Sequence, residues 1–195
     1  MRRVLVINKK VFVVTGTDTG VGKTWITAGL GRALVEMGVP TLALKPLETG
    51  CQLRPSLNED GILMAQATGQ TKPKAAMLRF SAPLAPPVAA EQEDRTIDFE
   101  DLMTQVEGHV EENQVSLIEG AGGLLSPLTW DHTIIDIARH FNAQVIVVAN
   151  DKLGCLNHIR LTLGAIRAHE LEVAAVVLTE TLPEMTVEQL PVGHH

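Results

Sequence analysis

The chain has 195 residues, of which 45% are hydrophobic and 20% charged, a composition typical of a globular protein that fits one domain. Its formal net charge of −7, with no block rich in lysine or arginine, argues against a nucleic-acid partner. The apolar stretch within residues 1–10 is only four residues long, too short for a signal peptide or a membrane span. Together with two cysteines far apart in the sequence, these features predict a cytoplasmic protein with no membrane partner.

Apolar runs alternate with helical patterns along the chain. Strands are predicted at residues 11–14, 41–44, 115–118, 145–149 and 173–178, and helices at 24–37, 62–67, 134–141 and 156–169. The strand segments are apolar throughout, which is typical of strands buried on both faces. We therefore expect one α/β domain over residues 1–195, of the P-loop type, with a doubly wound, mainly parallel sheet and helices on both faces.

The most informative stretch is Gly16-Thr-Asp-Thr-Gly-Val-Gly-Lys-Thr24, which follows the first strand and opens a helix. A glycine-rich loop at a helix N-terminus directs backbone N–H groups toward phosphate. Lys23 would reach the β- and γ-phosphates, and the Thr24 hydroxyl would bind Mg²⁺. The common loop has four residues between its first glycine and Gly-Lys-Ser/Thr, whereas Gly16 stands one place further away. This lengthened loop predicts binding of a nucleoside triphosphate.

Three charged residues lie where further phosphate or metal ligands are expected. Lys45 follows the second strand, and Pro46 keeps it out of helical geometry; it either neutralises charge during phosphoryl transfer or is a solvated loop lysine. Glu119 ends the third strand before a glycine-rich loop, where a carboxylate that holds Mg²⁺ is expected. Asp60 begins a helical pattern, either as a metal ligand or as a helix N-terminal charge.

Two other segments are less decisive. The prolines within residues 79–95 favour a surface connection. Residues 152–158 follow a strand and precede a helix, so their amides could bind an anion. Within them, Cys155 has no base nearby in the sequence and is interpreted as a packed thiol, and His158 as a capping or packing residue. No group of histidines and cysteines has metal-ligand spacing.

Taken in order, these motifs resemble the dethiobiotin synthetase family, the ATP-dependent ring-closing enzymes of biotin synthesis. The matches run from residue 11 to about residue 178 and comprise the lengthened loop, Lys45-Pro46 with Thr49-Gly50, Glu119-Gly-Ala-Gly-Gly123 and Lys152-Leu-Gly-Cys-Leu-Asn-His158. The resemblance implies a ligase that joins 7,8-diaminononanoate (7,8-diaminopelargonate) to CO₂ or bicarbonate, using ATP and Mg²⁺. A carbamate forms, ATP phosphorylates it, and the second amine closes the ring with release of phosphate.

The resemblance also implies roles for individual residues. Catalysis would depend on Lys23, Lys45 and Thr19. The nucleotide would be held by Asp18, Gly20, Val21, Gly22, Lys23, Thr24, Glu119, Gly122 and Thr179. The diamine or carbamate would be bound by Thr19, Lys45, Thr49, Pro83, Gly154, Cys155, Leu156 and Asn157, and Mg²⁺ by Thr24, Asp60 and Glu119. Family members are homodimers, so residues 153–157 would receive the carboxylate tail of a substrate bound to the neighbouring subunit, and residues 82–87 would line the substrate site.

Three departures from the family pattern are visible. The family ends its late strand with an asparagine that reads adenine, whereas Thr179 stands here and cannot copy a bidentate amide. The family continues for some tens of residues where this chain has about fifteen, so either the base is held differently or the C-terminus is shortened. Residues 1–10 precede the point where family members usually begin, as an N-terminal extension would.

Three other functions remain as alternatives. One is a P-loop ATPase switch of the partition or septum-positioning type, although such proteins carry a signature lysine at the position of Asp18. Another is a cobyrinate-type amide synthetase, which needs a glutaminase domain for which the chain has no room. The last is a catalytically impaired nucleotide-binding module, and the intact lysines and acids argue against it.

Overall fold

The computed structural model describes residues 9–110 and 113–180. The strands are β1 (Lys10–Gly16), β2 (Thr41–Leu44), β3 (Leu47–Glu48), β4 (Leu78–Arg79), β5 (Val115–Gly123), β6 (Gln144–Asn150) and β7 (Val173–Thr179). The helices are α1 (Lys23–Glu36), α2 (Asp60–Thr68), α3 (Pro86–Gln92), α4 (Phe99–Val110), α5 (Ile134–His140) and α6 (Cys155–Ala168). The expectations of an N-terminal extension and of a shortened C-terminus fall mainly on residues 1–8 and 181–195, outside the described residues.

Five strands form a parallel sheet in the order β2-β5-β1-β6-β7. Its centre is fully apolar: Val13 and Val14 of β1 and Val147 and Val148 of β6 are completely buried. Such runs are stable only where helices cover both faces, because apolar side chains leave a strand on alternate sides. The expected doubly wound α/β fold is therefore confirmed.

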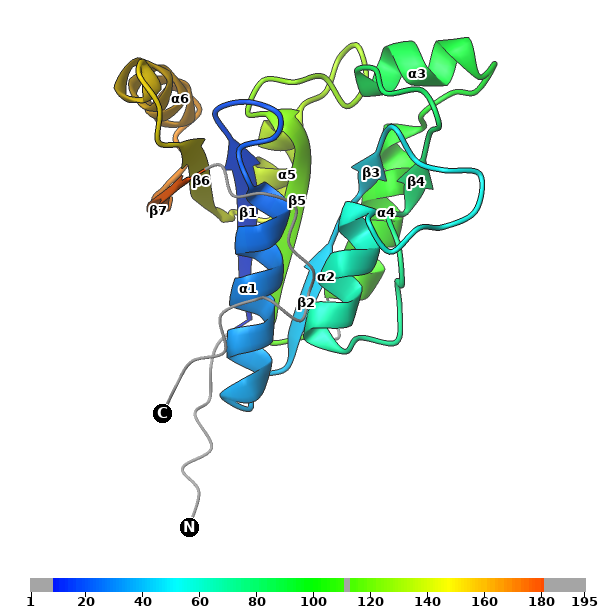
Figure 1. Ribbon diagram of the computed structural model, residues 1–195, viewed down its shortest axis with the longest axis horizontal. Helices are drawn as coiled ribbons and strands as arrows, with labels where there is room; N and C mark the ends of the chain where they lie inside the picture. Colours follow the sequence, from blue (N-terminus) through cyan, green and yellow to red (C-terminus); the bar gives the residue numbers. More distant parts are fainter. Residues whose placement is uncertain (1–8, 111–112, 181–195) are drawn as a thin grey trace.

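Helices cover both faces of this sheet (Figure 1). On one face α1 packs against β2 and β5 and contacts α2, and Ala28 and Met64 are buried together there. On the other face α4, α5 and α6 share one core with the sheet, in which Val106, Ile137 and Ile166 are completely buried. This arrangement leaves the ends of the strands as the edge at which loops can meet.

Between β2 and β5 the chain forms elements that the sequence did not predict. β3 and β4 make a parallel two-stranded sheet, and α3 begins with Pro86 and Pro87, so residues 79–95 are more ordered than a simple surface connection. Phe80 and Ala89 form a small separate core there. Gly50 N–H donates to Ala82 O at 3.2 Å, which ties this part to the loop after β2.

The expectation of burial on both faces is wrong for β7. Val176 and Leu178 are 40% and 53% exposed, and within the described residues β7 pairs only with β6. β7 is thus an edge strand with apolar side chains on its surface. No helix in the part of the chain that the structure covers is both long and apolar enough to cross a bilayer.

Candidate active site

Loops that follow four parallel strands meet at one edge of the sheet. Since the carboxyl ends of parallel strands share an edge, residues 17–22, 45–50, 124–126 and 151–154 all lie at this edge, together with the glycine-rich end of β5. The pairing of Val14 with Glu119 and of Leu44 with Ile118 sets the ends of β1, β5 and β2 level. The topology thereby brings together residues that are more than a hundred positions apart in the sequence.

The phosphate loop connects β1 to α1 by a backbone that suits glycine. Gly20 and Gly22 have φ values of 71° and 88°, in the left-handed region that other residues rarely adopt. α1 begins at Lys23, so the free N–H groups of its first turn lie at the loop. The Lys23 ammonium donates to Asp18 O at 3.2 Å. Burial, and then the charge of Lys45, lower the pKa of Lys23 below its ordinary value.

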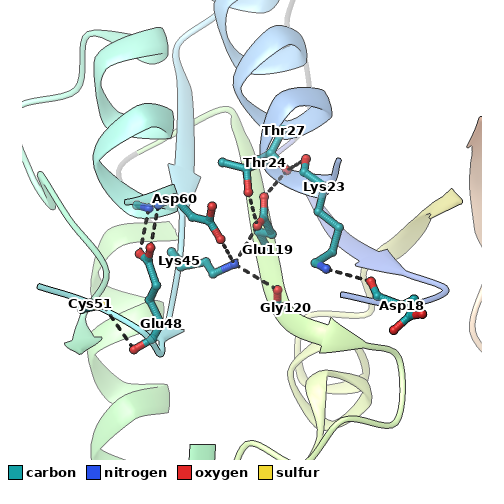
Figure 2. Close-up of polar contacts among 11 residues, drawn as sticks. Asp18, Lys23, Thr24, Thr27, Lys45, Glu48, Cys51, Asp60, Glu119 and Gly120 are labelled. Atoms are coloured by element: carbon teal, nitrogen blue, oxygen red, sulfur yellow. Dashed lines mark hydrogen bonds and ion pairs between the residues drawn. The ribbon is translucent and has the colours of Figure 1, made fainter. Parts of the chain in front are cut away.

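Lys45 is the centre of the site (Figure 2). Its side chain is only 3% exposed, and its ammonium lies 2.7 Å from Asp60 Oδ2, 2.7 Å from Glu119 Oε1 and 3.3 Å from Gly120 O. Burial by itself would lower the pKa of Lys45, but the carboxylates of Glu119 and Asp60 outweigh it and raise the pKa. The solvated-lysine alternative is therefore wrong, and Lys45 is a buried cation between two acids.

Glu119 is completely buried and receives hydrogen bonds on both carboxylate oxygens. Thr24 Oγ1 donates to Oε1 at 3.0 Å, and Thr27 Oγ1 donates to Oε2 at 2.7 Å. Thr27 was missed by the sequence reasoning. The signal was present, because residues three apart lie on one face of a helix and Thr24 was already assigned to the site.

Asp60 is held in place by a neighbouring acid. Glu48 accepts the backbone N–H groups of Asp60 and Gly61, at 2.6 and 3.1 Å, and so fixes the first turn of α2. Burial and the Asp60 charge raise the pKa of Glu48. Burial acts to raise the pKa of Asp60 as well, but the charge of Lys45 and its hydrogen bond outweigh burial, and the pKa of Asp60 is lowered.

A second acidic group lies beside this one. Ligand atoms of Glu48, Cys51 and Glu59 come within 4.8 Å of one another, a spacing that could hold a metal ion. However, both Glu59 oxygens accept from Arg79, at 2.7 and 2.8 Å, and both Glu48 oxygens accept backbone N–H groups. Burial, and then Glu48, raise the pKa of the Cys51 thiol to about 11, which disfavours the thiolate that metals bind. This group therefore supports the loop before α2, and the oxygens of Thr24, Asp60 and Glu119 are the set that could better hold a metal ion.

A pocket of about 900 Å³ opens over these residues. It is lined by Thr19, Gly20, Gly22, Lys23, Thr24, Trp25, Lys45, Glu48, Thr49, Leu57, Asn58, Asp60, Leu63, Gln66, Ala121 and Gly122. Nine of these were expected from the sequence; Trp25, Glu48, Leu57, Asn58, Leu63, Gln66 and Ala121 were not. Glu119 lies behind the pocket wall and reaches it through Thr24 and Lys45.

Other expected site residues lie outside the pocket. Asp18 Oδ1 accepts the Thr19 N–H at 2.7 Å in the phosphate loop, and Pro83 lies beside Gly50, where a Cβ would be 3.5 Å from that of Pro83. Gly154, Leu156 and Asn157 are exposed, and Cys155 is half-buried, its thiol 4.0 Å from an Asp151 oxygen. Val21 is buried and contributes its carbonyl oxygen to a bond with Thr179.

The fold and the loop define the chain as a P-loop nucleotide-binding protein. The model of the AAA domain family matches residues 10–192. A ParA family ATPase from Chlorobium tepidum TLS aligns with a TM-score of 0.52 at 14% identity, over 88% of this chain and 73% of its own. The BceF tyrosine kinase domain aligns with a TM-score of 0.52 at 18% identity, over 89% and 69%. At such identities these likenesses show the fold alone.

Closer relatives show the particular family. The chain is 38% identical over 182 residues to an ATP-dependent dethiobiotin synthetase of Aquifex aeolicus (strain VF5), covering 91% of this chain and 81% of the relative. It is 36% identical to the one of Caulobacter sp. (strain K31), over 90% and 78%. The chain belongs to the dethiobiotin synthetase family, and it is an enzyme of the ligase class that takes part in biotin synthesis with ATP.

Proposed function

We propose that this enzyme converts 7,8-diaminononanoate, CO₂ and ATP to dethiobiotin, ADP and phosphate. The observation that carries the proposal is the convergence of two lysines, two carboxylates and a helix N-terminus on one pocket. Phosphoryl transfer depends on positioning and on stabilising charge, and these groups supply both. No activated nucleophile is needed, because the substrate's own amine and carbamate oxygen are the attacking atoms.

The residues of the metal centre fit Mg²⁺. Thr24 Oγ1, Asp60 Oδ2 and Glu119 Oε1 are hard oxygen donors, and the two carboxylate oxygens already share one cation, the Lys45 ammonium. Mg²⁺ is usually held by one or two carboxylates together with waters and phosphate oxygens, so this donor set suits it. When bound there, Mg²⁺ would neutralise charge on the phosphates of ATP.

The chain's own residues would contribute as follows. The N–H groups of the loop and of the first turn of α1 would bind phosphate oxygens, with Lys23 on the β- and γ-phosphates. Lys45 would neutralise the carbamate whose oxygen attacks the γ-phosphorus as ADP leaves. Thr19 and Thr49 line the pocket and would hold the diamine. The second amine then attacks the carbamoyl carbon, a C–N bond forms, and phosphate leaves with the oxygen.

We also propose a cytoplasmic homodimer in which the partner binds the tail of the substrate. Residues 153–154 and 156–157 are exposed and outside the pocket, while they follow β6 at the same edge of the sheet. Leu153 is fully exposed and Leu156 is 73% exposed, as expected for apolar residues that contact another subunit. Both cysteines are free, in keeping with a reducing compartment.

Phosphate release from ATP, Mg²⁺ and bicarbonate, with and without 7,8-diaminononanoate, tests the reaction. Release that depends on the diamine, with a product heavier than the diamine by the added carbonyl, is expected. Phosphate release at the same rate with and without the diamine would instead indicate a switch ATPase. A sedimentation experiment at working concentration tests the dimer, and a monomer with full activity would contradict it.

A further inference from the structure

Thr179, the last residue of β7, contacts the phosphate loop. Its hydroxyl donates to Val21 O at 2.7 Å and lies 3.3 Å from Ala149 O. Its methyl carbon lies 3.3 Å from the place that a Cβ would take on Gly22. Both branches of this side chain therefore rest against residues 21 and 22 of the loop.

The bond to Val21 sets the direction of the next amide. Because a peptide bond is planar and trans, the C=O of Val21 and the N–H of Gly22 point in opposite directions. With the carbonyl held toward β7, the Gly22 N–H points away from β7, and Gly22 lines the pocket whereas Val21 and Thr179 do not. One hydroxyl group thereby orients a phosphate-binding amide.

Other contacts anchor the loop without fixing this peptide plane. The Val21 side chain is buried against Ile146 and Val148, which anchors the residue through its side chain and not through its peptide group. The Thr17 N–H donates to Val148 O at 2.9 Å at the start of the loop. The left-handed backbone of Gly22, with no side chain to restrict it, leaves the orientation of the peptide to its hydrogen bonds.

We propose that Thr179 is a positioning residue that orients the Gly22 amide toward the triphosphate by holding the Val21 carbonyl. The inference rests on the proposed function only in taking the ligand to be a nucleoside triphosphate. This positioning role differs from a hydrogen bond between Thr179 and adenine, since the Thr179 hydroxyl donates to a protein carbonyl and its methyl group faces Gly22. A contact of Thr179 with adenine stays a separate prediction.

Calorimetric titration with Mg²⁺-ATP and with inorganic tripolyphosphate tests this role, because tripolyphosphate has phosphates but no base. Thr179→Val removes the hydroxyl and keeps the shape, and it should weaken binding of both ligands about tenfold, the effect of losing one orienting hydrogen bond. Thr179→Ser keeps the donor and should bind both within about twofold of the parent chain. Thr162→Val is the matched control, since Thr162 donates within α6 to His158 O, away from the loop, and the affinities of this variant should not change.

Weaker ATP binding with unchanged tripolyphosphate binding would overturn the proposal in favour of a base contact. Equal losses in Thr179→Val and Thr179→Ser would also overturn it, because the serine retains the donor. If Thr179→Val does not fold, Thr179→Ala is titrated in its place with the same expectation. If the parent chain binds tripolyphosphate but shows no diamine-dependent phosphate release, the proposed function is refuted and the role of Thr179 is unaffected.

Discussion

Replacing Lys45 with methionine tests the charge balance at the centre of the site. Methionine has a similar length but no charge, so the variant leaves Glu119, which is completely buried, without its cation. Removing one partner of a buried ion pair costs about 3–5 kcal/mol of unfolding free energy. We expect the lower end, about 3 kcal/mol, because Thr24 and Thr27 still donate to Glu119 and Asp60 is 36% exposed.

Thermal unfolding measures this loss. For a chain of this size, about 3 kcal/mol corresponds to a fall in Tm of about 6–12 °C. Because the pKa of Lys45 is raised in the folded state, its stabilising effect is fully present below the ordinary lysine pKa and is lost only as pH rises through the folded value. The deficit should therefore be the same at about pH 7 and about pH 9. Diamine-dependent phosphate release should be abolished at both.

A double variant identifies the charge responsible. Lys45→Met combined with Glu119→Gln removes the buried uncompensated charge and leaves only the partly exposed Asp60 carboxylate without its cation, so it should recover about 2 kcal/mol relative to the single variant. Lys74→Met is the control, since Lys74 is exposed and its loss should change Tm by little. A Lys45→Met variant as stable as the parent, or a double variant no better than the single one, would refute the reasoning.

Three further predictions address the surroundings of the site. Cys155 should react with a thiol reagent at about pH 8 in the folded protein while Cys51 does not, because burial raises the pKa of Cys51 to about 11; two reactive thiols in the native state would contradict this. Gly22→Ala should cost about 1–2 kcal/mol and weaken ATP binding, because φ is 88° there; unchanged titration curves would speak against a strained loop. Because Thr27 orients Glu119, Thr27→Val should weaken Mg²⁺ binding about fivefold in a titration, and Thr27→Ser should bind Mg²⁺ like the parent. Equal Mg²⁺ affinities in the parent and both variants would contradict this role.

The strands of the large sheet could be predicted because they are apolar on both faces. All five lie where the sequence placed them, with deviations of at most five residues at either end. The two-residue strands β3 and β4 carry no periodic signal and form only when the loop after β2 meets the segment around residue 78. α4 is different: Leu102, Val106 and Val110 repeat at four-residue spacing on its buried face, so this helix was detectable and was missed.

The sequence predicted most of the charged residues that meet at the site, but not the contacts between them. Motif spacing identified Lys23, Thr24, Lys45, Asp60 and Glu119, since each was expected at a strand end or a helix start at the same edge of the sheet. The expected strand end at Glu119 is wrong, because β5 continues to Gly123. The burial of Lys45 was not predictable, because its two partners are 15 and 74 residues away and meet it only in the folded chain. Glu48 was missed for the same reason, as it acts by accepting backbone N–H groups of α2.

The charges of the site explain why a phosphate loop needs a second lysine here. Lys23 and Lys45 oppose Asp60 and Glu119, two positive against two negative charges, so the carboxylates that suit a metal ion are already balanced inside the protein. The Lys45 ammonium is paired with both carboxylates, at 2.7 Å from each. The Lys23 ammonium instead donates to a backbone carbonyl, and its pKa is lowered. Among the described residues, no carboxylate contacts the Lys23 ammonium directly. An entering triphosphate would therefore form its stronger ion pair with Lys23, and the phosphate would stabilise the charged form of this lysine. We therefore expect different tasks for the two lysines: Lys23 would receive the phosphates, and Lys45 would keep the two acids ordered until a metal ion binds to them and a carbamate pairs with the Lys45 ammonium.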